Sequence, residues 1–242
     1  MSSCRYTDGQ DEPVDKLLIP IKGYQDQPLL PLEDTVRPIA HLFIDIQDYV
    51  YTAKQNCKTP TDGLTPDESA AIYLYTMEFD SGLSIYHVLN ESLRSEKREI
   101  LKPWFRYLKL FLTGLHKLSP QPQTVFRGVK GVDLSTKYCT GVKFTWWGVS
   151  SCTTTVDVLN EEHFLGQLGT RTLFSIDCLN GKSIKSHSFF GDKEQEIILM
   201  PGSYFEVCGQ LKLSSDLHMI QLKERKPPID FVKPPFEKIS GN

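Results

Sequence analysis

Three short segments of this 242-residue chain carry the residues that could do chemistry. They are Val125-Phe126-Arg127-Gly128, Trp147-Gly148-Val149-Ser150-Ser151-Cys152 and Glu194-Gln195-Glu196-Ile197-Ile198-Leu199. Each reads as part of a β-strand in which polar side chains stand among apolar neighbours. An arginine binds anions, serine hydroxyls hold sugars or carboxylates, and carboxylates stabilise developing cations. In this order, the set suits a site that binds an anionic dinucleotide and labilises its glycosidic bond.

Arg127 follows the apolar residues Val125 and Phe126, and an arginine buried there without a partner would be costly. Its planar guanidinium suits a phosphate or carboxylate held at two points. The adjacent Gly128 would let a flat ring or an amide approach the backbone closely. The alternative interpretation is an ordinary surface arginine at a strand end.

Ser150 and Ser151 end an aromatic strand and begin a polar run. Their hydroxyls could hold a ribose or orient a carboxylate. A serine nucleophile is disfavoured because no G-x-S-x-G turn surrounds either residue. The alternative is a strand end or turn rich in serine and threonine, with no site.

Glu194 and Glu196 precede the apolar run Ile197-Ile198-Leu199-Met200. Alternation along this strand places both carboxylates on the same sheet face, next to each other. Two like charges so close require a compensating cation or a catalytic task. One carboxylate could stabilise an oxocarbenium cation while the other activates a nucleophile. The alternative is a solvated strand edge.

Helical patterns dominate the first half of the chain. Apolar residues recur on one face from Ile39 to Val50, and Thr65-Pro66-Asp67-Glu68 is a helix start with a capping box. Ser84 and Pro103 open two further amphipathic segments, the second ending at Ser119-Pro120. Residues 1–34 are polar and interrupted by prolines, so we expect a loosely ordered lead-in.

Strand patterns dominate the second half. The predicted strands are 124–128, 143–151, 171–178, 195–200, 203–208 and 217–223, with one short helix near 157–165. Helices followed by strands favour an α+β domain over residues 35–223, with a helical lobe at 35–120 and a mainly antiparallel β-core at 123–223. Neither common glycine-rich phosphate loop occurs. The tail, residues 224–242, is rich in Pro and Lys and is expected to be disordered.

Composition narrows the class of partner and compartment. A net charge of −3 disfavours nucleic acid, and no run approaches the roughly 20 apolar residues of a membrane span. The six cysteines form no C-x-x-C pair, and His41, His87 and His116 have no second ligand at metal-binding spacing. We therefore expect reduced thiols, no metal, no membrane partner and, without a signal-peptide pattern, a cytoplasmic location.

The three segments, in this order, resemble the Arg–Ser–Glu signature of the mono-ADP-ribosyltransferases, in the branch related to the arginine-specific vertebrate and binary-toxin enzymes. Residues 64–76, Lys102-Pro103-Trp104-Phe105 and His187-Ser188-Phe189-Phe190 also look like that family. The resemblance covers roughly residues 38–223. It implies a helical N-terminal lobe packed on two small β-sheets, with NAD in the cleft between them.

The resemblance also implies a role for each residue toward NAD. Arg127 would anchor the phosphates, and the backbone of Gly128 would hold the nicotinamide amide. Ser150 would contact the nicotinamide ribose and position Glu196, which would bond the ribose 2′-hydroxyl and stabilise the oxocarbenium ion. Since Cys152 stands where the family's Ser-Thr-Ser segment usually ends in serine, the choice between Ser150 and Ser151 as the leading hydroxyl stays open.

Further roles concern the acceptor. Glu194 would bind and activate a guanidinium, and Phe189 or Phe190 would contact a protein substrate with an exposed arginine. The expected activity is transfer of ADP-ribose from NAD, a co-substrate, to that arginine without a metal. The alternatives are an NAD glycohydrolase, in which water replaces the guanidinium, and a non-catalytic module that binds NAD or a protein. The sequence leaves the oligomeric state open.

Overall fold

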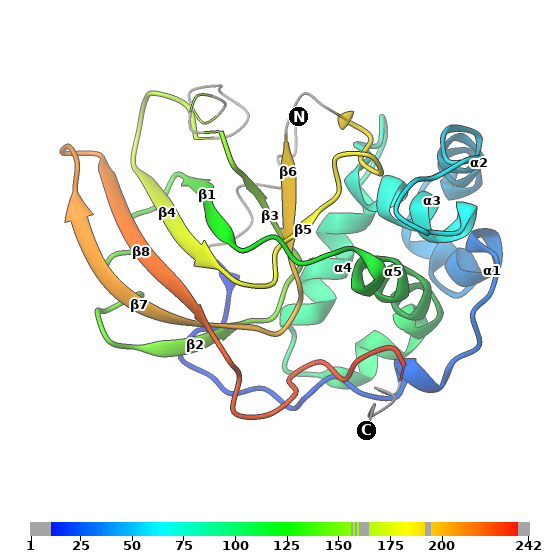
Figure 1. Cartoon of the computed structure of the whole chain (residues 1–242), viewed down its shortest axis with the longest axis horizontal. Helices are drawn as coiled ribbons and strands as arrows, with labels where there is room; N and C mark the ends of the chain where they lie inside the picture. Colours follow the sequence, from blue (N-terminus) through cyan, green and yellow to red (C-terminus); the bar gives the residue numbers. More distant parts are fainter. Residues whose placement is uncertain (1–10, 156, 158, 160–164, 192–194, 237–242) are drawn as a thin grey trace. The chain divides into compact units, whose positions relative to one another are not determined.

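The computed structural model describes residues 11–155, 157, 159, 165–191 and 195–236. The chain divides into two compact units, each described by itself. The sheet unit comprises Met1–Leu18, Pro120–Lys185 and Asp192–Pro228, and the helical unit comprises Ile19–Ser119, Ser186–Gly191 and Ile229–Asn242. Figure 1 shows helices in the first part of the chain and strands in the second, as the α+β prediction requires.

The helical unit contains five α-helices and three 3-10 helices among the described residues. They are η2 (Tyr24–Asp26), α1 (Leu32–Val36), η3 (Arg37–Leu42), α2 (Ile46–Asn56), α3 (Pro66–Thr76), α4 (Ile85–Arg94), η4 (Arg98–Trp104) and α5 (Phe105–Lys117). The capping box of α3 is confirmed: Thr65 Oγ1 accepts from Glu68 N at 3.2 Å, and Glu68 Oε2 accepts from Thr65 N at 2.8 Å.

Two helix boundaries differ from the prediction. The pattern from Ile39 to Val50 is divided between η3 and α2, because Asp45 adopts a left-handed conformation with φ 50°. Pro103 does not open a helix but lies inside η4, and α5 begins at Phe105. A proline lacks the N–H that an α-helical interior uses, so it is accommodated in the tighter turn before α5.

In the described part of the sheet unit there are eight strands. They are β1 (Gln123–Lys130), β2 (Lys143–Trp146), β3 (Ser150–Thr153), β4 (Arg171–Cys178), β5 (Lys182–Ser183), β6 (Glu196–Leu199), β7 (Ser203–Lys212) and β8 (Leu217–Arg225). Their order is β2-β7-β8-β4-β1-β3-β6-β5. The pair β4–β8 is parallel and the other pairs are antiparallel, so the mainly antiparallel prediction is confirmed.

The prediction of two separate sheets needs correction, since the strands form one hydrogen-bonded sheet. The junction between β1 and β3 is nevertheless narrow: only Phe126 and Thr153 are paired, whereas β1 and β4 are paired along eight positions. We call this junction the seam. It leaves β3, β6 and β5 as a small flap attached to a larger five-stranded part.

The predicted strand 143–151 is two strands with different partners. β2 pairs with β7, and β3 pairs with β6 and β1. Between them, the backbone N–H groups of Trp147 and Gly148 donate to the Glu12 carboxylate at 2.8 and 3.1 Å. These donors are satisfied by a side chain instead of a strand, so the chain can change partners here.

The described parts of both terminal segments are more ordered than the sequence predicts. Ile21 pairs with Val232 in a parallel bridge, and Tyr24 and Phe231 are buried. Lys109 of α5 donates to the carbonyls of Gln25 and Pro235. Within the helical unit, residues of the lead-in and of the tail therefore contact each other and helix α5.

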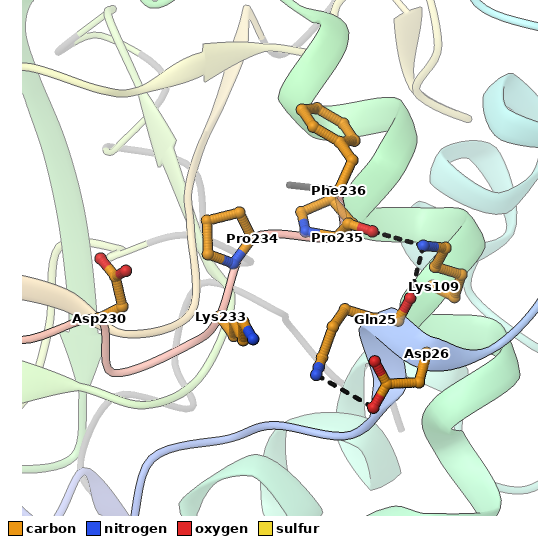
Figure 2. Close-up of a pocket in the computed structure, with 8 residues that line it drawn as sticks. All are labelled: Gln25, Asp26, Lys109, Asp230, Lys233, Pro234, Pro235 and Phe236. Carbon is orange, nitrogen blue, oxygen red and sulfur yellow. Dashed lines mark hydrogen bonds between the residues drawn. The ribbon is translucent and has the colours of Figure 1, made fainter. Parts of the chain in front are cut away.

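A cavity of about 640 Å³ lies where these segments meet α5 (Figure 2). It is lined by Gln25, Asp26, Lys109, Asp230, Lys233, Pro234, Pro235 and Phe236. None of the residues singled out for chemistry lines this cavity.

Candidate active site

The structure brings Arg127, both serines and Glu196 together at the seam. Arg127 lies on β1, Ser150 and Ser151 on β3, and Glu196 opens β6, the strand next to β3. All four residues are at most 2% exposed. Buried polar side chains on three adjacent strands require partners, so the interpretations as surface arginine, solvated edge and polar turn are wrong.

The register of β3 and β6 distinguishes the two serines. Thr153 pairs with Glu196 and Ser151 pairs with Ile198, and directly opposed residues point to the same sheet face. Ser151, Thr153 and Glu196 therefore share one face, while Ser150 points to the other. The strand geometry favours Ser151 over Ser150 as the hydroxyl beside Glu196.

Ser151 has a second distinguishing property. Its Oγ is fully buried and has no hydrogen-bond partner among the described residues. A buried hydroxyl without a partner is costly, by about 1–3 kcal/mol, and at an active site it marks a place for a ligand atom.

Arg127 bridges the seam with its side chain. Its Nη1 donates to the carbonyl oxygen of Ser151 at 2.7 Å. Pairing of Phe126 with Thr153 directs Arg127 to the opposite face, which also carries the buried residues Val125 and Cys152. The guanidinium thus provides β3 with a donor that the diverging β1 backbone does not supply at this point.

The Cys152 thiol lies close enough to Arg127 and Glu196 for both charges to affect its pKa. Burial raises the pKa of its thiol to about 12, Arg127 opposes this shift, and Cys178 and Glu196 reinforce it. The side chain of Cys152 belongs to the hydrophobic core of the sheet unit. A thiol that stays protonated inside a core does not act as a nucleophile, so Cys152 is a packing residue.

The same-face prediction for the two glutamates required a strand that reaches residue 194, and no such strand is seen among the described residues. β6 begins at Glu196, and the preceding Gln195 has φ 47°, a left-handed conformation that strands do not contain. Alternation therefore does not extend back to residue 194, and Glu194 itself lies outside the described residues. A non-glycine residue held at positive φ next to a buried carboxylate is the kind of strain that clusters at functional sites. The predicted helix near 157–165 also falls largely outside the described residues.

Gly128 is required by packing. A Cβ atom at this position would lie 2.8 Å from Leu165 Cβ, closer than real side chains approach. Leu165 belongs to a small apolar cluster with Leu159 and Leu173, against which Phe126 packs.

Phe189 and Phe190 belong to the helical unit, so the structure groups them with α3 and not with the seam. Their rings meet edge to face with centroids 5.1 Å apart, and Phe189 is 43% exposed. The exposed ring is available for contact with another molecule.

Two residues that matter here were missed from the sequence. Thr153 shares the face of Ser151 and Glu196, and a period-two reading of β3 could have found it. Glu12 sets the boundary between β2 and β3, but it is 135 residues from Trp147 in sequence, and no local pattern marks it.

No group of three or more His, Cys, Asp or Glu side chains among the described residues is arranged to hold a metal ion. In the same residues, no helix combines the length and apolar character needed to cross a membrane.

The chain was compared with protein families, curated proteins and solved structures. Residues 42–228 match the family model described as NAD:arginine ADP-ribosyltransferase. A comparison with curated protein sequences finds no match.

Similar solved structures agree on the fold. The ADP-ribosyltransferase HopU1 of Pseudomonas syringae is 20% identical with a TM-score of 0.62, over 86% of this chain and 100% of that one. The Vis toxin of Vibrio splendidus, solved with agmatine, is 19% identical with a TM-score of 0.55, over 84% and 90%. The eukaryotic mono-ADP-ribosyltransferase ART2.2 is 20% identical with a TM-score of 0.54, over 82% and 85%.

The family match spans three quarters of the chain and contains all three segments of the seam. The resemblance inferred from those segments is therefore confirmed. The chain belongs to the NAD:arginine ADP-ribosyltransferase family and is an NAD-dependent mono-ADP-ribosyltransferase.

Proposed function

We propose that the acceptor of this enzyme is a protein arginine, to which it transfers ADP-ribose with release of nicotinamide. The observation that carries the proposal is the seam. A buried carboxylate on β6 shares a face with a serine hydroxyl on β3 that has no partner among the described residues, and a buried arginine on the opposite face holds the carbonyl of that serine. The name of the family and the agmatine complex of Vis, whose ligand carries a guanidinium, support arginine as acceptor.

Glu196 is the catalytic residue in this proposal. Its carboxylate bonds the 2′-hydroxyl of the nicotinamide ribose and stabilises the positive charge that develops as nicotinamide departs. Burial strengthens this stabilisation, since water does not screen a charge inside the protein as it does at the surface. The reaction requires no proton transfer to carbon and no metal.

Ser151 takes the role that the resemblance gave to Ser150. Its hydroxyl lies on the face of Glu196 and is free to bond a ribose oxygen or the carboxylate. Ser150 points into the other face and contributes packing. The buried residues thus fit a nucleotide sugar, because they offer a carboxylate acceptor and the Ser151 hydroxyl, which has no partner among the described residues.

Arg127 acts first as a positioning residue, because it holds the carbonyl of Ser151 and thereby the strand that carries the hydroxyl. We also propose that its guanidinium contacts the NAD phosphates, as the resemblance implies. The Gly128 backbone would hold the nicotinamide amide, and a ligand there would have to displace or lie beside Leu165.

Glu194 is proposed to bind and activate the guanidinium, as the resemblance implies. Phe189 and Phe190 are proposed to contact the protein that carries it, supported by the exposure of Phe189. Aromatic rings and carboxylates are both groups that bind a guanidinium.

The test is incubation of the full chain with labelled NAD and agmatine. Glu196→Gln should reduce formation of ADP-ribosyl-agmatine by about 10²–10³-fold, the cost of removing one preorganised charge-stabilising group. Glu206→Gln, a carboxylate on β7 bonded to Arg225, is the matched control and should stay active. Equal labelling by wild type and Glu196→Gln would contradict the assignment.

The same assay separates the alternatives. Free ADP-ribose as the main product, with agmatine present, would identify an NAD glycohydrolase. Absence of NAD binding in calorimetry would identify a non-catalytic module. Glu194→Gln should lose transfer to agmatine and keep release of nicotinamide, because water then remains as the acceptor.

We also propose that the enzyme works in a reducing compartment such as the cytoplasm. The five described cysteines, Cys57, Cys139, Cys152, Cys178 and Cys208, are all free thiols. Free thiols are usual in reducing compartments, whereas secreted proteins pair them.

A further inference from the structure

One face of helix α3 receives the segment of residues 186–191. Ser69, Tyr73 and Thr76 are spaced by four and three residues, so they form a stripe on that face. The stripe contacts the segment at three points: Ser69 bonds His187, the ring of Tyr73 meets that of Phe189, and Thr76 bonds the Phe189 backbone. All these residues belong to the helical unit.

His187 is the deepest of these contacts. It is 1% exposed, its Nδ1 lies 2.9 Å from Ser69 Oγ, and its Nε2 lies 3.2 Å from Asp62 Oδ2. A carboxylate only accepts hydrogen bonds, so in the neutral ring Nε2 carries the proton and Nδ1 accepts from the serine hydroxyl. Burial lowers the pKa of His187, although Asp62 opposes the shift, and this favours the neutral ring.

The turn that supplies Asp62 is itself shaped for this purpose. Asp62 has φ 56° and Gly63 has φ 69°, and the Thr61 hydroxyl donates to Asp62 Oδ2 at 2.7 Å. A left-handed aspartate held by its neighbour has its carboxylate in a fixed position before His187 binds it.

The order Asp62–His187–Ser69 is that of a hydrolase triad, but its burial gives it another task. Ser69 is 1% exposed at the end of the first turn of α3, where no substrate reaches its hydroxyl. The array therefore connects parts of the protein: it ties the start of the 186–191 segment to the 61–63 turn and to α3.

Directly after this tether, the segment turns and exposes an aromatic side chain. Phe189 N–H donates to Thr76 Oγ1 at 2.8 Å, and Gly191 N–H donates to the Ser188 carbonyl at 3.2 Å. With its backbone held in this way, the exposed ring of Phe189 has a defined place on the surface of the helical unit. Glu196 follows Phe190 by six residues in the chain.

We propose that His187 is a positioning residue for the acceptor: through Ser69 and Asp62 it holds the Phe189–Phe190 pair in the orientation that binds the guanidinium-bearing substrate. This inference rests on the proposed function, because it assigns these rings to the acceptor. His187 acts through its neighbours and does not touch NAD or the reacting atoms.

The experiment compares two reactions of the full chain: NAD hydrolysis without acceptor, and transfer to agmatine. His187→Phe keeps a ring but removes both hydrogen bonds, and it should raise KM for agmatine about tenfold while KM for NAD and hydrolysis stay within about twofold. Ser69→Ala removes one bond and leaves the segment's sequence intact, so it should move the same ratio less. His41→Phe, an exposed histidine on η3, is the matched control and should move neither.

A second measurement tests the attachment of the 186–191 segment to α3 independently of enzyme activity. Hydrogen exchange at the Phe189 amide should accelerate in His187→Phe and in Ser69→Ala, since both release the segment from α3. Asp62→Asn keeps an oxygen that can accept from Nε2, so it should largely preserve slow exchange and rescue the ratio relative to Asp62→Ala.

The outcomes separate the two proposals. An unchanged agmatine-to-hydrolysis ratio in His187→Phe, an equal loss of both reactions, or unchanged exchange at Phe189 would overturn the positioning role while an active wild type upholds transferase activity. A wild-type chain that releases no nicotinamide from NAD would overturn the proposed function and the acceptor role with it. If His187→Phe does not fold, Ser69→Ala decides.

Discussion

The seam and the α3 stripe hold functional side chains in two different ways. At the seam, the backbone ladder of β3 and β6 sets which residues share a face, and Ser151 and Glu196 are placed by register. On α3, single side chains hold the 186–191 segment, chiefly through the bonds of His187 and Thr76. A ladder is cooperative, whereas a tether depends on individual contacts.

The difference suggests a division between chemistry and choice of acceptor. Changes at the seam should damage folding or every reaction, because β3 supports them all. Changes on the stripe should alter one reaction relative to another. Variants of the two regions should therefore differ in whether they lose stability, every reaction, or only one reaction.

The largest effect is expected at Glu12. Glu12→Ala leaves the N–H groups of Trp147 and Gly148 without their acceptor in a buried place, which should cost about 3 kcal/mol of unfolding free energy. Urea denaturation measures it. Glu12→Gln keeps one oxygen acceptor and should cost less, and a stability equal to wild type in Glu12→Ala would show that the break between β2 and β3 forms without this carboxylate.

Arg127 should come next. Arg127→Met fills similar space but removes the donor to the Ser151 carbonyl, and it should cost about 2 kcal/mol of unfolding free energy together with most of the activity. Denaturation and nicotinamide release measure the two effects. Arg171→Met, an arginine on β4 that bonds the Gly166 and Gly169 carbonyls at the surface, is the comparison and should cost less.

The two serines should then differ in activity more than in stability. Ser151→Ala removes an unpartnered hydroxyl, so it should lower kcat/KM for NAD at least about tenfold with no loss of stability. Ser150→Ala should leave kcat/KM for NAD nearly unchanged, since its side chain points to the other face. The reverse order of activities would show that the site uses the core-facing side of β3.

The smallest effect should be the pH dependence that comes from the stripe. His187 has a folded-state pKa below its ordinary value of 6.5, so the unfolded chain binds more protons below that pH. The contribution of His187 to the unfolding free energy should therefore be fully present above pH 6.5. As the pH falls below 6.5, that contribution should decrease by at most about 1.4 kcal/mol per pH unit.

Urea denaturation between pH 7 and pH 5 checks this dependence, which His187→Phe should lack and His41→Phe should keep.

Asp62 affects the unfolding free energy in a different pH range. The hydroxyl of Thr61 lowers the Asp62 pKa below 3.8, so its contribution is lost only at more acidic pH. An identical pH dependence of the unfolding free energy in wild type and His187→Phe would show that His187 does not cause it.

Local patterns were sufficient for much of the fold. The α3 capping box, the order of helices before strands and most strand positions follow from residues within a few positions of one another. They failed where a residue distant in sequence determines the local structure. Glu12 divides the predicted strand 143–151, and the bridge between Ile21 and Val232 orders segments that the sequence predicts to be loosely ordered.

The kinds of residues at the site, their order along the chain and, through them, the family can all be inferred from the amino-acid sequence. Three further features required the folded chain: Ser151 and not Ser150 shares a sheet face with Glu196, Gln195 ends the strand alternation before Glu194, and His187 ties its segment to α3. The physical reason is that residue type is a local property, whereas the face of a side chain depends on which strand or helix lies beside it. A shift of one residue in register reverses that face, and no spacing within a single strand records the shift.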